Sequence, residues 1–133
     1  MKAVFADTSF YVAMVSPRDR FHQSACDFIR EYRGRIVTTE QVLTESGNWF
    51  ARCGDRDVFL DLVEAIRADA RSTVVWSERP GFEAGLRLYA ARPDKKWSLT
   101  DCISFVVMQE HALAEALTTD HHFEQAGYKA LLR

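Results

Sequence analysis

Short apolar runs alternate along the chain with longer segments in which apolar residues recur every three or four positions. The first run, residues 3–6, has no polar alternation, which indicates a strand that is covered on both faces. Further apolar or β-branched runs predict strands at residues 36–38, 73–76, 116–119 and 130–132. Strands that are separated by helix-like segments in this way favour an α/β fold with a mainly parallel sheet.

The segments between these runs have the spacing of amphipathic helices. They predict helices at residues 10–15, 20–32, 40–53, 55–70, 82–91 and 99–111. Two helix starts carry a recognisable cap. Thr39 stands where it can cap the third helix, and Ser98 with Asp101 forms a capping-box pattern before the last one. We therefore expect an α/β three-layer sandwich, in which helices flank a mainly parallel central sheet of four or five strands.

Length and composition fit a single globular domain. The 133 residues have the size of one domain, which we place at residues 1–133, and the 47% of hydrophobic residues can fill a core. The formal net charge of -2 excludes a surface that is basic overall, but a local basic patch could still contact nucleic acid. Lys95 and Lys96 are the best placed cations for such a contact, because they closely precede the helix of Asp101.

The sequence predicts neither export nor membrane insertion. No apolar run approaches the ~20 residues that span a bilayer, and Asp7 interrupts the first run before it reaches the ~7–15 residues of a signal-peptide core. Cys26, Cys53 and Cys102 are scattered and include no C-x-x-C pair, which argues against a disulfide framework or a structural zinc site. We expect a cytoplasmic protein without a membrane partner.

Four acidic residues are placed where an α/β fold binds its ligands. Asp7 and Asp120 directly follow predicted strands. Asp101 lies in the first turn of an apolar helix, and Glu45 lies in a helix that follows a strand. Ligands of parallel sheets gather outside the carboxyl ends of the strands. Singly, each acid also fits an ordinary role, as a helix cap, a turn residue or a solvated side chain that Arg52 could pair. Together they indicate carboxylates that converge on one crevice.

Such a cluster of carboxylates indicates a metal site. Like charges that are held close raise one another's pKa and repel, so they need a cation. Oxygen ligands select hard ions such as Mg²⁺ or Mn²⁺. Ions of this kind activate water for phosphodiester hydrolysis, and that reaction needs no protein nucleophile. The hydroxyls of Thr8, Ser9 and Thr100 lie beside the acids in the sequence, where they could orient the carboxylates or bound water.

Four motifs resemble those of the PIN-domain ribonucleases, and in particular the VapC-type toxins of bacterial and archaeal toxin–antitoxin pairs. The motifs are FADTSF at residues 5–10, TTEQVLTE at 38–45, WSLTDC at 97–102 and LTTDHHF at 117–123. The resemblance continues to residue 128 and spans almost the whole chain. It implies that the acidic and hydroxyl positions of the family correspond to Asp7, Glu45, Asp101, Asp120 and Thr8.

The resemblance also implies an activity and a set of partners. The expected activity is that of an endoribonuclease that depends on Mg²⁺ or Mn²⁺, with the four acids and Thr8 as catalytic residues. The expected partners are an RNA substrate, a second copy of the chain in a homodimer, and a cognate antitoxin whose C-terminal segment covers the acidic groove.

Three other functions fit parts of the pattern. A phosphotransfer domain also places an aspartate after its first strand, but a phosphatase of that kind needs a second aspartate where Ser9 stands. A receiver domain needs further acids where Phe5 and Ala6 stand. A non-catalytic binding module would bind no metal. Within the PIN class, an RNA-processing nuclease would have the same site without being a toxin.

The histidines and tryptophans carry weaker expectations. His121 and His122 directly follow the last of the four acids and are expected to form a solvated turn, although they could touch a substrate. Trp49, Trp76 and Trp97 could stack on a base. Core packing is the simpler expectation for all three.

Overall fold

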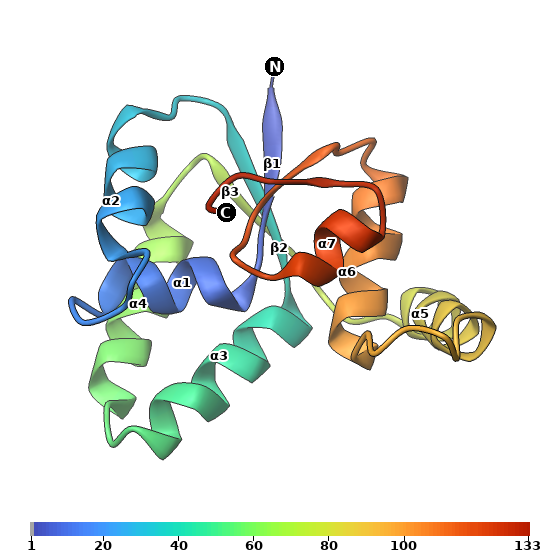
Figure 1. The fold of residues 1–133 in the computed structure, drawn as a ribbon. Helices are drawn as coiled ribbons and strands as arrows, with labels where there is room; N and C mark the ends of the chain where they lie inside the picture. Colours follow the sequence, from blue (N-terminus) through green and yellow to red (C-terminus); the bar gives the residue numbers. More distant parts are fainter. Residues whose placement is uncertain (1) are drawn as a thin grey trace.

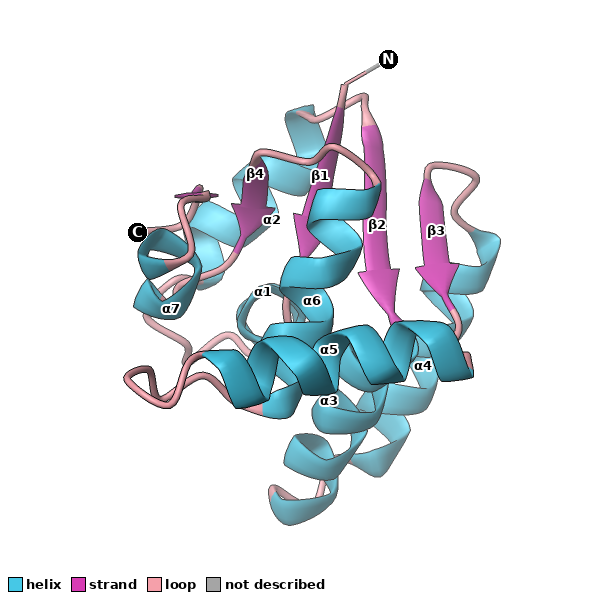
Figure 2. Cartoon of the chain, turned by 90° about the vertical axis from the view of Figure 1, so that its right-hand side faces the viewer, coloured by secondary structure: helices cyan, strands magenta, loops and turns pink. Residues whose placement is uncertain are grey.

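Five parallel strands form the central sheet of the computed structural model, which describes residues 2–133 (Figures 1 and 2). The strands are β1 (Ala3–Ala6), β2 (Arg35–Thr39), β3 (Ser72–Val75), β4 (Glu115–Leu117) and β5 (Lys129–Ala130). Their order across the sheet is β3-β2-β1-β4-β5, and each neighbouring pair is parallel. The expected fold class is confirmed, with five strands and an entirely parallel sheet in the described chain.

Seven helices within residues 2–133 connect and cover the strands. They are α1 (Thr8–Val15), α2 (His22–Glu31), α3 (Glu40–Arg52), α4 (Arg56–Ala68), α5 (Arg79–Ala91), α6 (Leu99–Glu110) and α7 (His121–Gln125). In Figure 1, α1, α2 and α4 lie on one side of the sheet, and α6 and α7 lie on the other. In Figure 2, α3 lies beyond the carboxyl ends of the strands, and α5 packs mainly on α6.

Both predicted helix caps form. The Thr39 hydroxyl accepts a hydrogen bond from the Val42 amide at 3.0 Å and so starts α3. At the start of α6, the Ser98 hydroxyl accepts from the Asp101 amide at 3.0 Å, and the Asp101 carboxylate accepts from the Ser98 amide at 3.1 Å. This reciprocal capping box fixes the Asp101 side chain at the first turn of α6.

The short helix α7 has no counterpart among the predicted elements. It begins after Asp120, whose carboxylate accepts a hydrogen bond from the His122 amide at 2.9 Å. Its five residues complete little more than one turn, so no apolar period of 3.6 residues can show in the sequence. Phe123 is buried and anchors α7 to α6 through Phe105, with 5.0 Å between the ring centroids.

The core surrounds β1, whose residues 4–6 are 0% exposed, as expected of a strand that is covered on both faces. Trp97 packs edge-on against Phe105 and is buried, and Trp49 is partly buried against the core. The core expectation is wrong for Trp76, which is 59% exposed. Trp76 directly follows β3, and β3 is an edge strand, so no further strand covers its side chain.

Two further expectations concern membranes and disulfides. None of the helices within residues 2–133 combines the length and the apolar composition that a bilayer crossing requires. Cys26, Cys53 and Cys102 are free thiols, which agrees with the absence of a cysteine framework in the sequence.

Candidate metal centre

The expected acids lie around the carboxyl end of β1, beside β4. The chain order of the sheet reverses at this point, because β1 has the next strand β2 on one side and the late strand β4 on the other. Side chains that follow two such strands face a common crevice. Asp7 follows β1 directly, and its amide donates to the Leu117 carbonyl at the end of β4 at 3.1 Å. Asp120 follows β4 after Thr118 and Thr119.

Asp7 is a buried carboxylate that two hydroxyl groups hold in place. The residue is only 5% exposed, and its Oδ2 accepts hydrogen bonds from the hydroxyls of Thr118 at 2.9 Å and Ser9 at 3.1 Å. Thr118 Oγ1 also accepts from the Asp120 amide at 3.0 Å. Ser9 Oγ accepts from the Thr119 amide at 3.0 Å. Ser9 thus stands beside the first acid, as expected, whereas the sequence motifs gave no indication of the contact with Thr118.

The negative charge of Asp7 is unfavourable at this position. Burial raises the pKa of Asp7 from 3.8 to about 6. Hydrogen bonds from the Thr118 hydroxyl and the Thr8 amide lower this pKa, whereas the charges of Asp101 and Glu45 raise it. At neutral pH the carboxylate is therefore ionised in surroundings that favour its neutral form. A bound cation would relieve this conflict.

Glu45 reaches the same crevice from α3. The hydroxyl of Thr8, the first residue of α1, donates to Glu45 Oε1 and lies 3.4 Å from the Val42 carbonyl oxygen. The Thr8 hydroxyl therefore links the start of α1 to α3, next to Asp7 in the sequence. The alternative expectation is a solvated glutamate that Arg52 could pair, and the part of the chain that the structure describes does not contain that pair. Glu45 is partly buried.

Asp101 caps α6, as its position predicted, and its carboxylate also faces His122. The residue is 8% exposed, and its Oδ2, which the Ser98 amide contacts, lies 3.0 Å from Nδ1 of His122. Burial raises the pKa of Asp101, and the charge of Asp120 acts in the same direction. The Ser98 amide and His122 lower it.

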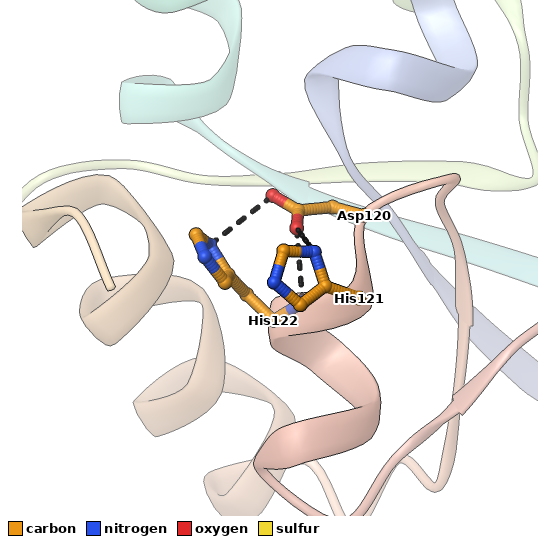
Figure 3. A group of neighbouring side chains, drawn as sticks. All are labelled: Asp120, His121 and His122. Carbon is orange, nitrogen blue, oxygen red and sulfur yellow. Dashed lines mark hydrogen bonds and ion pairs between the residues drawn. The ribbon is translucent and has the colours of Figure 1, made fainter. Parts of the chain in front are cut away.

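Asp120 stands beside His121 and His122 at the start of α7 (Figure 3). Nδ1 of His122 lies 3.4 Å from Asp120 Oδ2, and Nδ1 of His121 lies 3.6 Å from Asp120 Oδ1. Each of the three residues offers one ligand atom, and these atoms all lie within 4.8 Å of one another, a group compact enough to hold a metal ion. The expected solvated turn fits His121, whose side chain is 57% exposed.

The solvated-turn expectation is wrong for His122. Its side chain is 19% exposed and contacts Asp101 as well as Asp120. Asp120 is the N-cap of α7 and accepts a hydrogen bond from the His122 amide, so His122 lies in the first turn of that helix. No local sequence pattern indicates its contact with Asp101.

Thr100 lines the same hollow as Glu45, between α3, α5 and α6. Its hydroxyl hydrogen-bonds to none of the four acids within residues 2–133. Thr100 precedes Asp101 by one residue on α6, which turns the two side chains about 100° apart around the helix axis.

The donor set fits a hard cation. The charges of Asp101 and Glu45 raise the pKa of Asp7, and that of Asp120 raises the pKa of Asp101, so the four carboxylates form one electrostatic group. Carboxylate oxygens suit Mg²⁺ or Mn²⁺. Within residues 2–133 the ligand atoms of Asp7, Glu45 and Asp101 do not all come within 4.8 Å of one another, so the arrangement is open rather than a closed cage.

The fold and the acidic crevice can now be compared with known proteins. A model of the PIN domain matches residues 4–128 of the chain. The chain therefore belongs to the PIN-domain family.

Among its relatives is the 23S rRNA-specific endonuclease VapC20 of Mycobacterium tuberculosis, from strains CDC 1551 and H37Rv. Each is 28% identical to this chain over 129 residues, which cover 94% of the chain and 95% of the relative. A crystal structure of M. tuberculosis VapC20, a Sarcin-Ricin loop cleaving toxin, superposes with a TM-score of 0.86. It shares 23% identity over 94% of this chain and 95% of its own. The resemblance to VapC-type PIN ribonucleases is thus confirmed.

Proposed function

We propose that this chain acts as one nuclease domain, residues 1–133, that hydrolyses RNA phosphodiester bonds with Mg²⁺ or Mn²⁺. In this proposal Asp7, Glu45, Asp101 and Asp120 hold the cation. The observation that carries the proposal is the convergence of these carboxylates at one edge of the sheet: Asp7 and Asp101 are buried there, the Thr8 hydroxyl binds Glu45, and His122 joins Asp101 to Asp120. Membership of the PIN family and the similarity to a 23S rRNA-specific endonuclease support RNA as the substrate.

Asp7, Glu45, Asp101 and Asp120 would hold a divalent cation, which would supply charge neutralisation and water activation for phosphodiester hydrolysis. The chain contributes the placement of the ligands. Hydroxyls from Thr118 and Ser9 keep Asp7 Oδ2 oriented, and the Thr8 hydroxyl keeps Glu45 turned inward. Asp101 is held by its capping box at the first turn of α6, where the exposed amides of the helix also favour a negative charge.

We further propose that the protein is a cytoplasmic toxin that forms a homodimer and pairs with a cognate antitoxin. Support for this part comes from the VapC-type relatives rather than from the geometry of the crevice. Co-purification with the product of an adjacent small gene, and loss of RNA cleavage in that complex, would be expected. An active enzyme with no such partner would instead favour an RNA-processing nuclease of the same class.

RNA cleavage is the direct test. The wild-type chain with Mg²⁺ or Mn²⁺ should cleave RNA internally, and both EDTA and Asp7→Asn should abolish cleavage. Asp94→Asn is the matched control, because Asp94 is an exposed acid that is paired with Arg92 at 2.9 Å and contacts none of the four site acids. Equal cleavage by all the samples would refute the metal-dependent mechanism.

Two other classes of function predict different results. A non-catalytic binding module would give neither cleavage nor Asp7-dependent heat in a calorimetric titration with Mg²⁺ or Mn²⁺. A phosphotransfer domain would give a stable phosphoryl adduct on Asp7 after incubation with a phosphoryl donor. The buried Oδ2 of Asp7 already accepts two hydroxyl hydrogen bonds, an arrangement that suits a fixed ligand.

A further inference from the structure

We propose that the hollow between α3, α5 and α6 is a pocket for one unpaired nucleobase of the RNA. The hollow has a volume of about 450 Å³, within the ~300–1,000 Å³ typical of small-ligand sites. Glu45 belongs to its wall, so a group that enters the hollow lies directly beside the acidic crevice. This inference rests on the proposed nuclease function, and it specifies how that site would select its substrate.

One face of α3 supplies the polar wall of the pocket. Gln41, Glu45 and Asn48 recur at helical spacing along it, with Thr44 beside them. Among residues 2–133, no group hydrogen-bonds to the side chains of Gln41, Thr44 or Asn48. Side-chain amides both donate and accept hydrogen bonds, which is the capacity needed to bind the edge of an unpaired base.

Phe82 on α5 supplies the aromatic surface of the pocket. It lines the hollow and is 41% exposed, so its ring is available for stacking. Stacking on an aromatic side chain is the usual way in which proteins hold an unpaired base of RNA. The pocket thus combines a stacking surface with unpaired hydrogen-bonding groups, and both are needed for base recognition.

Close packing between α5 and α6 fixes the position of Phe82. Gly85 is buried against Ile103, and a Cβ atom at position 85 would overlap Ile103 Cγ1. Ile103 also lines the hollow. The wall that carries Phe82 is therefore held in place before any ligand binds, and a preformed pocket loses less entropy when it is filled.

The charge of the pocket indicates which bases it favours. Glu40 lines it and accepts a hydrogen bond from the Ser77 amide at 2.8 Å through Oε1. Carboxylate oxygens accept hydrogen bonds but cannot donate them. A base with an exocyclic amino group, as in adenine, cytosine or guanine, offers such a carboxylate more donors than uracil does. We therefore expect uracil to be the least favoured base.

The hollow also continues toward a basic surface. Leu99, the first residue of α6, lines both this pocket and a neighbouring hollow that contains Lys95 and Lys96. An RNA strand that passes the start of α6 could place a base beside Phe82 and its phosphates beside the two lysines. Asp101 of the acidic crevice lies two residues after Leu99, in the first turn of the same helix.

Binding and cleavage should be measured separately with the full chain. The probes for binding are short fluorescent oligoadenylate, oligocytidylate and oligouridylate, titrated with Mg²⁺ onto the Asp7→Asn variant, which should not cleave them. Adding Phe82→Ala or Asn48→Ala to that variant should weaken oligoadenylate binding about tenfold, in line with the loss of one stacked or hydrogen-bonded base. Oligouridylate binding should change less.

Leu86→Ala and Gln109→Ala are the matched controls. Leu86 lies on the same helix as Phe82 and is 40% exposed, and Gln109 is an exposed amide on α6, but neither lines the pocket. Both controls should bind like Asp7→Asn alone. In an otherwise wild-type chain, Phe82→Ala and Asn48→Ala should also shift the positions at which a mixed RNA is cut.

Failure of the pocket and failure of the nuclease would look different. One outcome is that the wild-type chain cleaves RNA while Phe82→Ala and Asn48→Ala cut and bind RNA like the control variants. That result would refute the pocket and would leave the proposed nuclease activity supported. If the wild-type chain cleaves nothing, base-dependent binding still supports the pocket, and equal binding of all three probes refutes it. If Phe82→Ala alters the sedimentation of the chain, this face belongs to a contact between copies, and the pocket is refuted.

Discussion

Nδ1 of His122 lies 3.0 Å from Oδ2 of Asp101, although the two residues belong to different helices and the rest of α6 and the whole of β4 separate them in the sequence. The contact joins the start of α7 to the start of α6. It also brings an imidazole between Asp101 and Asp120, because the same Nδ1 is 3.4 Å from Asp120 Oδ2. Asp101 and Asp120, whose negative charges repel each other, thus share His122 as a partner.

Replacement of His122 should therefore impair the site more than replacement of its neighbour. We expect His122→Ala to lower RNA cleavage ~10–100-fold, the usual cost of losing a group that positions metal ligands. His121→Ala is the control and should lower cleavage less, because the His121 side chain is mostly exposed and lies beside Asp120 and the His122 ring rather than beside Asp101. Single-turnover cleavage over a range of Mn²⁺ concentrations measures both. Equal losses would argue against a special role for His122.

Removal of the Asp7 charge should stabilise the metal-free fold. The pKa of Asp7 in the folded chain, about 6, lies above the ordinary 3.8, so the folded state binds more protons between these pH values. The free energy of unfolding therefore falls as pH rises through this range, by about 3 kcal/mol from this group. In EDTA, Asp7→Asn should raise the free energy of unfolding by up to about 3 kcal/mol at pH 7.5, and by little near pH 4.

Urea unfolding at the two pH values checks this expectation, with Asp94→Asn as the exposed control. Saturating Mg²⁺ should reduce the advantage of Asp7→Asn, because a cation that binds the carboxylates stabilises the wild-type fold. A metal-free Asp7→Asn variant that is less stable than wild type at pH 7.5 would contradict the raised pKa.

Thr118 should matter through its hydroxyl rather than its bulk. The group donates to Asp7 and accepts from the Asp120 amide, and the residue is 0% exposed. Thr118→Val keeps the shape but leaves the Asp120 amide unpaired and Asp7 Oδ2 with only the Ser9 hydroxyl, so we expect a loss of about 1–3 kcal/mol in the free energy of unfolding. Thr118→Ser keeps the hydroxyl and should cost clearly less. Urea unfolding in EDTA compares the two, and equal losses would show that only packing is affected.

Two glycines of α5 should respond in opposite ways to alanine. Gly85→Ala would force the new methyl group against Ile103 and should cost about 1–3 kcal/mol. A Cβ at Gly81 meets nothing within 4 Å, so Gly81→Ala should be neutral or stabilising by up to about 1 kcal/mol. Thermal or urea unfolding measures both. A Gly85→Ala variant as stable as wild type would show that α5 can move away from α6.

The two lysines ahead of α6 should contribute to RNA binding in a salt-dependent way. For single-stranded RNA, each phosphate contact adds about 0.7 to the slope of log affinity against log salt concentration. Lys95→Ala combined with Lys96→Ala should therefore lower the slope by about 1.4 if both contact phosphates. Lys129→Ala is the control, because this exposed lysine begins β5, at the other end of the strands. Fluorescence titration of the Asp7→Asn variant at several salt concentrations measures the slopes.

The sequence predicted the elements that have a periodic pattern or a local cap. The strand runs and helix spacing indicated the parallel sheet, and the caps at Thr39 and Ser98 were visible because each depends on residues only three apart. The placement of Asp7 and Asp120 followed from the general rule for strand ends, without any knowledge of the strand order.

Other parts of the site depend on contacts that no local pattern encodes. Thr118 meets Asp7 only because β4 pairs with β1, and His122 meets Asp101 only because α7 packs against α6. The exposure of Trp76 likewise depends on β3 being the last strand of the sheet. An apolar residue at a strand end is predicted to be buried unless the edge of the sheet is known.

The pairing of β1 with β4 also affects how the protein folds. The hydrogen bond from Thr118 to Asp7 spans 111 positions of the chain. A contact of that range forms only after a large loop has closed, and such contacts slow folding. The helices can form before this closure, but the cluster of carboxylates cannot. During refolding, affinity for the cation should therefore recover later than helix content, and a partly folded chain should be inactive.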